Sequence, residues 1–497
     1  MKVDRSAPPV GTVRDWLDAR ADAGGVAVTF PETGQQLTWT ELRDTAAKTA
    51  RDLTGQGIAK GDSVAIIHPN GPQGVTALYA TLYGGFRATM INLAAGPDAI
   101  AYALEHSEAR VAFVHDDQLE MFDKTRPEGL SHYAPGQSEA PLHELSAADD
   151  ALLMYTSGTT GRPKGVVHTH SSLLAGGWTV TIAHDLGPTD RGLCVLPIYH
   201  INGLCVTVMG SLVSGGSLAM VSKFSASRFW AQCETGGANW FSVVPTIISH
   251  LLHGDAEPSE AQKAAFRFGR SASSALAVET QNAFQKRFGL SIVESLGLTE
   301  TAAQCTSNPL DPAAQKIGSP GYGFGNEVRI ADDKGQVSAT DVEGEIQIRG
   351  PNVMKEYLKN PEATRDTFIG DWLRTGDLGR MDADGFIFVT GRLKELIIKG
   401  GENIAPREID EALYEHGDVV EAAAFARPCA QYGERVEAAV RLSEGSSATA
   451  DALRDLCIER VGKFKAPDKV HVLSELPKGP SGKIQRLYLN EMLYGKA

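Results

Sequence analysis

The stretch YTSGTTGRPKG occupies residues 155–165 and follows the apolar run ALLM at residues 151–154. It packs three glycines, two cations and four serine or threonine hydroxyls into eleven residues. Glycine lets backbone N–H groups approach an anion closely, and hydroxyl and ammonium groups add donors. The stretch therefore predicts a cradle for a polyphosphate. It differs from the Walker pattern, because Lys164 follows a proline and precedes Gly165. A flexible surface turn, the alternative interpretation, needs neither the hydroxyls nor the cation.

On both sides of this loop, helical and strand patterns alternate. A capping signal at residues 38–41 precedes a predicted helix to about residue 56, and apolar runs at residues 63–67, 88–91 and 110–114 predict buried strands. Such alternation favours mostly parallel sheets with helices on both faces. A second alternating block spans residues 190–310. The expected fold class is therefore α/β, with mixed α/β sheets in a large N-terminal domain.

The character of the sequence changes after Tyr322. Residues 328–330, 345–349 and 386–389 read as short strands between turns, which predicts a small β-rich unit. A segment of just over 100 residues after Gly391 has its own helix–strand alternation. We expect an N-terminal domain over residues 1–391, a connection at 392–394 and a small α+β C-terminal domain over 395–497.

Composition excludes several classes of protein. The chain has 497 residues, of which 42% are apolar and 22% charged, which excludes disordered, collagenous and disulfide-scaffold proteins. A net charge of −14 argues against nucleic acid or an anionic membrane surface as partner. The six cysteines form no CxxC pair, and the N-terminus lacks an apolar signal-peptide core. The uncharged segment 192–222 is interrupted by proline, histidine and glycines, so no membrane span is expected and the predicted location is cytoplasmic.

Six further motifs accompany the phosphate loop in order along the chain: PIYH (197–200), GLTE (297–300), RTGD (374–377), GRLK (391–394), GGEN (400–403) and PSGK (480–483). Each motif alone is weakly specific. Together they resemble the signature of the acyl-adenylate-forming superfamily, which includes AMP-forming acyl-CoA synthetases, over nearly the whole chain. The resemblance implies ATP and CoA as cosubstrates and Mg²⁺ as cofactor, and an acid that attacks the α-phosphate of ATP before a thiol displaces AMP.

The resemblance also implies roles for individual residues. Lys483 would bridge the carboxylate and the α-phosphate, Thr299 would contact that phosphate and Glu300 would bind Mg²⁺. A solvated lysine and a capping Thr–Glu turn are the alternatives. Leu296 stands where the family usually has an aromatic residue that stacks on adenine. The nucleotide site would comprise Thr156, Ser157, Gly158, Thr159, Thr160, Gly161 and Lys164 for the phosphates, Ser273, Ser274, Ala275, Leu296 and Gly297 for adenine, and Asp377 and Arg392 for the ribose.

The C-terminal domain would move between two poses. Lys483 and a thiol must reach the same carbonyl in successive steps, so the domain is expected to swing about a pivot at Lys394. Gly400 and Gly401 would line the pantetheine tunnel, where a side chain would block the thiol. A simple hairpin turn is an equally good explanation of that glycine pair.

Two stretches of sequence narrow the range of acids expected as substrate. Residues 238–246 (ANWFSVVPT) and 306–310 (TSNPL) look like the branch that contains oxalate–CoA ligases. A small dianion needs donors for its second charge. His200 matches the family's gate residue, although a lone histidine is more often a core residue. We expect the acyl pocket to use His200, Asn202, Arg270, Ser273 and Lys316, with malonate and sulfoacetate open beside oxalate.

Three functions remain open at this point. An AMP-forming acid–CoA ligase leads, because the chain carries all the motifs and no carrier domain follows them. A stand-alone adenylation enzyme that loads a carrier protein is the second. A non-catalytic nucleotide-binding regulator is the third, and the presence of Lys483, Glu300 and Asp377 argues against it. The sequence does not decide the oligomeric state.

Overall fold

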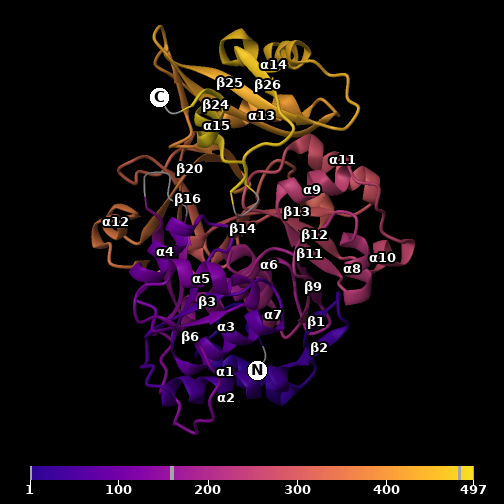
Figure 1. The fold of residues 1–497 in the computed structure, drawn as a ribbon. Helices are drawn as coiled ribbons and strands as arrows, with labels where there is room; N and C mark the ends of the chain where they lie inside the picture. Colours follow the sequence, from indigo (N-terminus) through magenta and orange to yellow (C-terminus); the bar gives the residue numbers. More distant parts are fainter. Residues whose placement is uncertain (1–2, 157–161, 480–482, 496–497) are drawn as a thin grey trace.

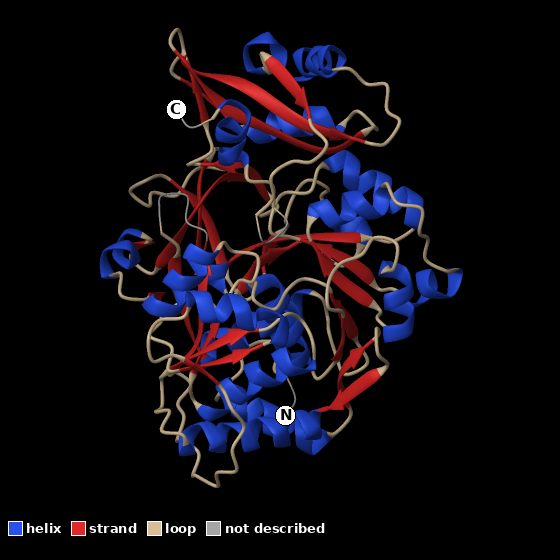
Figure 2. Ribbon diagram, viewed as in Figure 1, coloured by secondary structure: helices blue, strands red, loops and turns tan. Residues whose placement is uncertain are grey.

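A computed structural model describes residues 3–156, 162–479 and 483–495. Within these ranges the chain forms four β-sheets with helices packed against them (Figure 1). Figure 2 shows the helices on both faces of the sheets in the larger, N-terminal body. The predicted α/β fold class is confirmed, with a smaller C-terminal unit that contains both helices and strands.

The first sheet carries the phosphate loop. Its strands lie in the order β18 (Glu356–Tyr357), β8 (Lys164–Thr169), β7 (Asp150–Thr156), β4 (Arg87–Met90), β3 (Ser63–Ile67), β5 (Val111–Val114) and β6 (Ser131–His132). The strands from β7 to β6 run parallel, whereas β8 and β18 are antiparallel to their neighbours. β7 ends at Thr156, in the first part of the predicted cradle, and β8 begins at Lys164, the lysine of the cradle.

The second sheet has nine strands. They lie in the order β15 (Tyr322–Gly323), β14 (Ala303–Ser307), β13 (Ile292–Leu298), β12 (Phe268–Ser271), β11 (Trp240–Val243), β9 (Arg191–Cys194), β10 (Ser217–Met220), β1 (Val26–Phe30) and β2 (Gln35–Thr38). The central run from β13 to β1 is parallel. Because parallel strands end at one edge, the loops after β12 and β13 lie together.

Helices cover both sheets. Thr38 and Glu41 form the predicted capping box at the start of α2, since each side chain bonds the backbone N–H of the other residue. The helices of the large body are α1 (Val13–Ala23), α2 (Trp39–Gly55), α3 (Pro72–Gly84), α4 (Pro97–His106), α5 (Leu119–Thr125), α6 (His170–Ala183), α7 (Gly210–Ser214), α8 (Phe229–Gly236), α9 (Pro245–Leu252), α10 (Glu260–Ala265), α11 (Val278–Phe288) and α12 (Pro361–Asp366). Short turns of other helix types are η1 (Asp116–Gln118), η2 (Asn202–Met209), η3 (Thr299–Thr301) and η4 (Pro312–Ala314).

The predicted β-rich unit forms a sheet of its own. Its order is β16 (Glu327–Ala331), β17 (Gly344–Arg349), β20 (Trp372–Met381) and β19 (Phe368–Ile369), and β21 (Ile387–Arg392) also pairs with β20. The pairing of β20 with β21 sets Asp377 opposite Arg392. The register of this strand pair therefore brings two predicted ribose contacts side by side.

The C-terminal unit has a separate hydrophobic core. Its sheet comprises β22 (Ile397–Lys399), β23 (Glu402–Ile404), β24 (Val419–Cys429), β25 (Gly433–Leu442) and β26 (Lys469–Val472). The helices are α13 (Pro406–Tyr414), α14 (Ala450–Lys465) and α15 (Arg486–Tyr494). Ile409, Ala412 and Leu413 form the buried face of α13, and that core includes Val436 and Val440 of the sheet. The limits of the domains and the hinge at 392–394 stay a prediction.

The uncharged segment 192–222 is a buried part of the fold. It contains β9, η2, α7 and β10, in agreement with the strand–helix–strand interpretation. Among the described residues, no helix combines the length and the apolar character that crossing a membrane requires.

Candidate functional site

A cavity of about 240 Å³ lies between the large body and the C-terminal unit. The walls come from the loop after β12, from β13, from the β20–β21 pair and from the segment before α15. These elements bring together predicted site residues that are more than 200 residues apart in the chain. The lining includes Ser273, Ser274, Ala275, Leu296, Gly297, Asp377, Arg392 and Lys483.

The predicted adenine wall is tightly constrained. A Cβ on Gly297 would lie 1.5 Å from the carbonyl oxygen of Ala303, so only glycine lets β14 approach β13 here. Leu296 packs against the β-rich sheet beside Ile330, Ile346 and Ile387. An apolar side chain thus occupies the position where the family usually has an aromatic ring.

The predicted ribose contacts form an ion pair. Arg392 Nε donates to Asp377 Oδ1 at 2.5 Å, and the Asp377 side chain is buried. The Asp377 carboxylate raises the pKa of the Arg392 guanidinium above its ordinary value, against the effect of burial. The ion pair therefore places a carboxylate and a guanidinium on the same wall of the cavity.

Lys483 projects into this charged region from the short segment before α15. The N–H of Gly479 donates to the Lys483 carbonyl at 2.7 Å, which fixes its backbone. Burial and the nearby Arg392 lower the pKa of Lys483 to about 8, while Asp377, Glu395 and Glu300 act in the opposite direction. Lys483 is therefore only partly protonated at mildly alkaline pH. A bound anion nearby would favour the protonated ammonium form.

Glu300 lies in η3, directly after β13. Tyr357 of β18 donates a hydrogen bond to Glu300 Oε1 at 2.7 Å, and the Lys164 ammonium lies 4.5 Å from the centre of the Tyr357 ring. The predicted metal ligand and the lysine of the phosphate loop therefore meet through a residue that sequence reasoning missed. Nothing in the stretch around Tyr357 marks it, because its role depends on the pairing of β18 with β8.

The backbone of Thr299 is held by a buried histidine. The His168 ring is bonded to the Thr299 carbonyl oxygen at 2.7 Å and to Ser172 at 3.1 Å. Burial lowers the pKa of His168 to about 4, so the ring is neutral at physiological pH. Sequence reasoning also missed this contact.

Part of the predicted phosphate cradle falls outside the described residues. Ser157, Gly158, Thr159, Thr160 and Gly161 belong to that part. The strands on either side are described: Thr156 pairs with Lys164 in the register of β7 and β8. The ends of the cradle therefore lie next to each other at the edge of the first sheet.

Arg270 lies at the centre of a buried polar network behind Ser273. Its Nε donates to Gln304 Oε1 at 3.0 Å, and its Nη1 donates to Ser242 Oγ at 3.0 Å and to Asn202 Oδ1 at 3.2 Å. Asn202 in turn donates to Ser273 Oγ at 3.1 Å. Within the described ranges no carboxylate pairs with Arg270, and burial lowers the pKa of its guanidinium to about 9. The network holds a positive charge that only neutral groups solvate.

Three of the predicted acyl-pocket residues thus share one network, in which Asn202 links Arg270 to Ser273. His200 precedes η2 by two residues, with its ring 5.6 Å from that of Tyr199. Gln304 and Ser242 were not predicted. Ser242 is inside the quoted stretch 238–246, but neither residue carries a charge or a spacing that would single it out.

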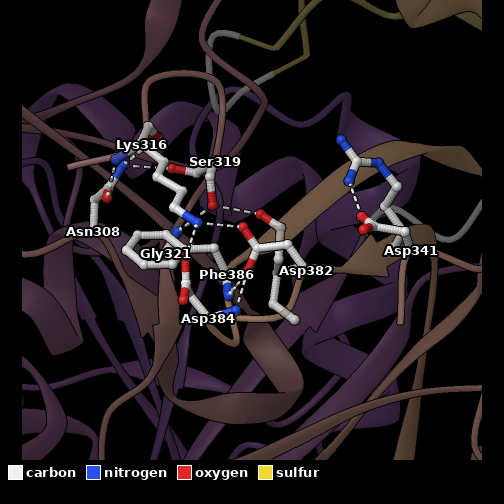
Figure 3. Close-up of polar contacts among 10 residues, drawn as sticks. Asn308, Lys316, Ser319, Gly321, Asp341, Asp382, Asp384 and Phe386 are labelled. Carbon is white, nitrogen blue, oxygen red and sulfur yellow. Dashed lines mark hydrogen bonds and ion pairs between the residues drawn. The ribbon is translucent and has the colours of Figure 1, made fainter. Parts of the chain in front are cut away.

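Lys316, the fifth predicted acyl-pocket residue, belongs to a separate cluster of charges. Its ammonium pairs with Asp382 at 2.5 Å and with Asp384 at 2.7 Å, and it lies 4.6 Å from the Phe386 ring centre. Figure 3 shows the side chain pointing to these two carboxylates. The two carboxylates offset the charge of the ammonium, whereas Arg270 has no such partner in the described ranges. The role of Lys316 in the acyl pocket stays a prediction.

Gly400 and Gly401 form the turn between β22 and β23, with φ angles of +62° and +88°. Lys394 lies in the exposed turn between β21 and β22. None of the three lines the cavity in this pose. Their predicted roles in the thiol tunnel and the hinge stay predictions.

Two family models match the chain. "AMP-binding enzyme" covers residues 16–358, and "AMP-binding enzyme C-terminal domain" covers residues 408–483. A sulfoacetate–CoA ligase of Cupriavidus necator is 44% identical over 478 residues, which span 92% of this chain and 93% of that protein. An oxalate–CoA ligase of Arabidopsis thaliana is 33% identical over 476 residues, or 90% and 92% of the two chains.

A solved structure has the same fold. ATP-bound MatB from Rhodopseudomonas palustris superposes with a TM-score of 0.90 at 28% identity, over 98% of this chain and 99% of that one. The chain belongs to the AMP-binding enzyme family and is an AMP-forming acid–CoA ligase that uses ATP, Mg²⁺ and CoA.

Proposed function

We propose that this ligase activates a short acid that carries a second anionic group, a sulfonate or a further carboxylate. One observation carries the proposal: Arg270 is buried among neutral hydrogen-bond partners, with no carboxylate pairing it in the described parts of the chain. A buried cation is stable only when an anion or strong hydrogen bonds compensate it. The substrate's second anion would supply that compensation.

Sulfoacetate is the member of this class that we put first. The relative with 44% identity acts on it, whereas the oxalate–CoA ligase is 33% identical. A guanidinium offers a planar fork of donors to a tetrahedral or planar oxyanion. Asn202 and Ser242 accept hydrogen bonds from the guanidinium, and the Ser242 hydroxyl donates to Asn202 Oδ1 at 3.0 Å, so neutral groups fix the orientation of that fork.

The first step joins two anions, so positive charge and positioning dominate it. A carboxylate oxygen attacks the α-phosphorus of ATP, and the bond from that phosphorus to the β-phosphate bridging oxygen breaks to release pyrophosphate. Lys483 would neutralise charge between carboxylate and phosphate. Asp377 would accept bonds from the ribose hydroxyls, with Arg392 beside it. The CoA thiol then attacks the acyl carbon, and AMP leaves with the electrons of the acyl–oxygen bond.

The residues near the triphosphate fit a magnesium site. Mg²⁺ takes one or two carboxylates and fills its other positions with phosphate oxygens and water. Glu300 offers one carboxylate that Tyr357 orients, and the described residues contain no ready-made group of three or more metal ligands. Mg²⁺, when bound, would offset the negative charge of the phosphates, and Glu300 would hold it.

A pyrophosphate-release screen tests the proposal. Purified protein, ATP and Mg²⁺ are mixed with sulfoacetate, oxalate, malonate, acetate or octanoate, without CoA. We expect acid-dependent pyrophosphate with one of the dianions, at a kcat/KM at least about a hundredfold above that for acetate, because buried donors discriminate strongly against a missing polar group. Higher activity on octanoate than on all dianions would refute the substrate class.

The acceptor is tested in the same assay. Addition of CoA followed by mass measurement should give the thioester of the acid that released pyrophosphate. A product that forms only on a carrier protein would identify the alternative acceptor. Binding of ATP with no acid-dependent pyrophosphate from any tested acid would favour the regulator.

A further inference from the structure

A buried carboxylate of the C-terminal unit lies outside the cavity lining but connects to it. Glu421 of β24 is completely buried and contacts three basic side chains: Lys478 at 2.8 Å, Arg441 at 3.3 Å and His250 at 3.4 Å. Burial alone would raise the pKa of Glu421, but the bonds from His250 and Lys478 outweigh it and lower the pKa to about 2. The carboxylate is therefore a fixed negative centre.

One of these partners comes from the large body. His250 lies on α9, the helix that begins with the cavity residues Pro245 and Thr246. The preceding residue, Ser249, donates from its hydroxyl to the Val420 carbonyl at 2.6 Å. Two successive residues of α9 thus contact two successive residues of β24. In Figure 1 the C-terminal unit lies directly above α9.

Another partner leads directly to Lys483. Lys478 pairs with Ile484 in an antiparallel bridge, and the N–H of Gln485 donates to the Pro477 carbonyl at 2.8 Å. Together with the bond between Gly479 and Lys483, these contacts hold Lys483 on a two-stranded ladder. Glu421 therefore anchors one side of the ladder that carries the lysine while His250 anchors Glu421 to the large body.

We propose that His250 and Glu421 are positioning residues for the adenylation step: they hold the C-terminal unit in the pose that delivers Lys483 to the cavity. This inference rests on the proposed two-step reaction. The contact of His250 with Glu421 crosses between the two parts of the protein, so it breaks when the C-terminal unit moves to admit the thiol. Losing it weakens the first half-reaction and leaves the second unchanged.

The main variant is His250→Ala. Glu421 keeps Lys478 and Arg441, so we expect the fold to persist, and a melting curve checks this. His250→Gln keeps a donor at a similar reach and should restore function. His253→Ala is the matched control, because the His253 ring lies at the end of the same helix and is bonded to the Ser249 carbonyl at 2.8 Å.

Two half-reactions are measured with the acid that the screen identifies. We expect His250→Ala to lower pyrophosphate release about three- to fivefold, the upper part of the range for a partly exposed polar pair. Thioester formation from the supplied acyl-adenylate and CoA should stay within about twofold of wild type. Equal loss of both half-reactions, no loss of either, or an equal effect of His253→Ala would overturn the proposal.

A second readout needs no substrate, so it separates this proposal from the proposed function. Hydrogen exchange in the free full-length protein follows the peptides that contain Gly479 and Gln485. If His250 holds the pose, their amides should exchange at least about threefold faster in His250→Ala than in wild type and in His253→Ala. Unchanged exchange would overturn the positioning role even if no tested acid were activated.

Discussion

The phenol oxygen of Tyr357 lies 2.7 Å from Glu300 Oε1 and donates a hydrogen bond to it. The aromatic ring of the same tyrosine faces Lys164, whose ammonium lies 4.5 Å from the ring centre. The carboxylate proposed to hold Mg²⁺ is therefore oriented by a residue that also contacts the phosphate loop.

Tyr357→Phe should raise the Mg²⁺ concentration for half-maximal pyrophosphate release by about tenfold, because outer partners of a metal ligand tune affinity on this scale. The ring stays in place for Lys164, so the KM for the acid should change little. Tyr133→Phe is the matched control, since that phenol donates to Asp52 at 2.7 Å. An unchanged Mg²⁺ dependence in Tyr357→Phe would contradict the assignment of Glu300.

The lowered pKa of Lys483 predicts how the rate of pyrophosphate release depends on pH. Burial and Arg392 lower the pKa of Lys483 to about 8, so the ammonium is present below that pH and is lost as pH rises through it. The kcat/KM for pyrophosphate release should therefore fall on the alkaline side of pH 8. The assay contains no CoA, so titration of the thiol does not interfere.

Two variants test that interpretation. Lys483→Arg should remove the alkaline fall, because a guanidinium stays charged, although its different shape should lower the rate. Lys483→Ala should abolish adenylation while thioester formation from supplied acyl-adenylate largely persists. Equal loss of both half-reactions would contradict this division.

The sequence predicts local features well where neighbours in the chain decide them. The capping residues Thr38 and Glu41 lie three positions apart, and the strand at Ser63–Ile67 is a continuous apolar run. Gly297 and Asp377 were found because short motifs identify them. Tyr357, Ser242 and Gln304 were missed, because only the pairing of distant strands brings them to the site.

Lys316 and Arg270 show how tertiary structure distinguishes two cations that look alike in the sequence. The charge of Lys316 made it a candidate for the acid's second anion, but Asp382 and Asp384, 66 and 68 residues later, neutralise it. Arg270 has an equal charge and no such partner among the described residues. The sequence contains both cations, and only tertiary structure decides which one has a carboxylate partner.

Arg270→Met should raise the KM for the dianionic acid by about a hundredfold, since it would remove the charge and the donors that we propose bind the second anion. Arg270→Lys should recover part of the loss, because it restores charge without the planar fork. The KM for ATP should stay within about twofold, as Arg270 does not line the cavity that holds the predicted nucleotide contacts. A parallel rise in the KM for ATP would indicate general distortion and would contradict a specific role.

Gly401 allows backbone strain to be separated from obstruction of a tunnel. Its φ of +88° strains any L-residue, yet a Cβ there would meet no described atom within 4 Å in this pose. Gly401→Ala and Gly401→Leu share the strain and differ in side-chain length. We expect the leucine variant to slow thioester formation at least about tenfold more than the alanine variant, with pyrophosphate release alike in the two.

Gly370→Leu, at a turn with φ of +63° and similar open space, controls for strain elsewhere. If leucine at Gly401 slowed pyrophosphate release selectively, the glycine pair would serve the first step and not the path of the thiol.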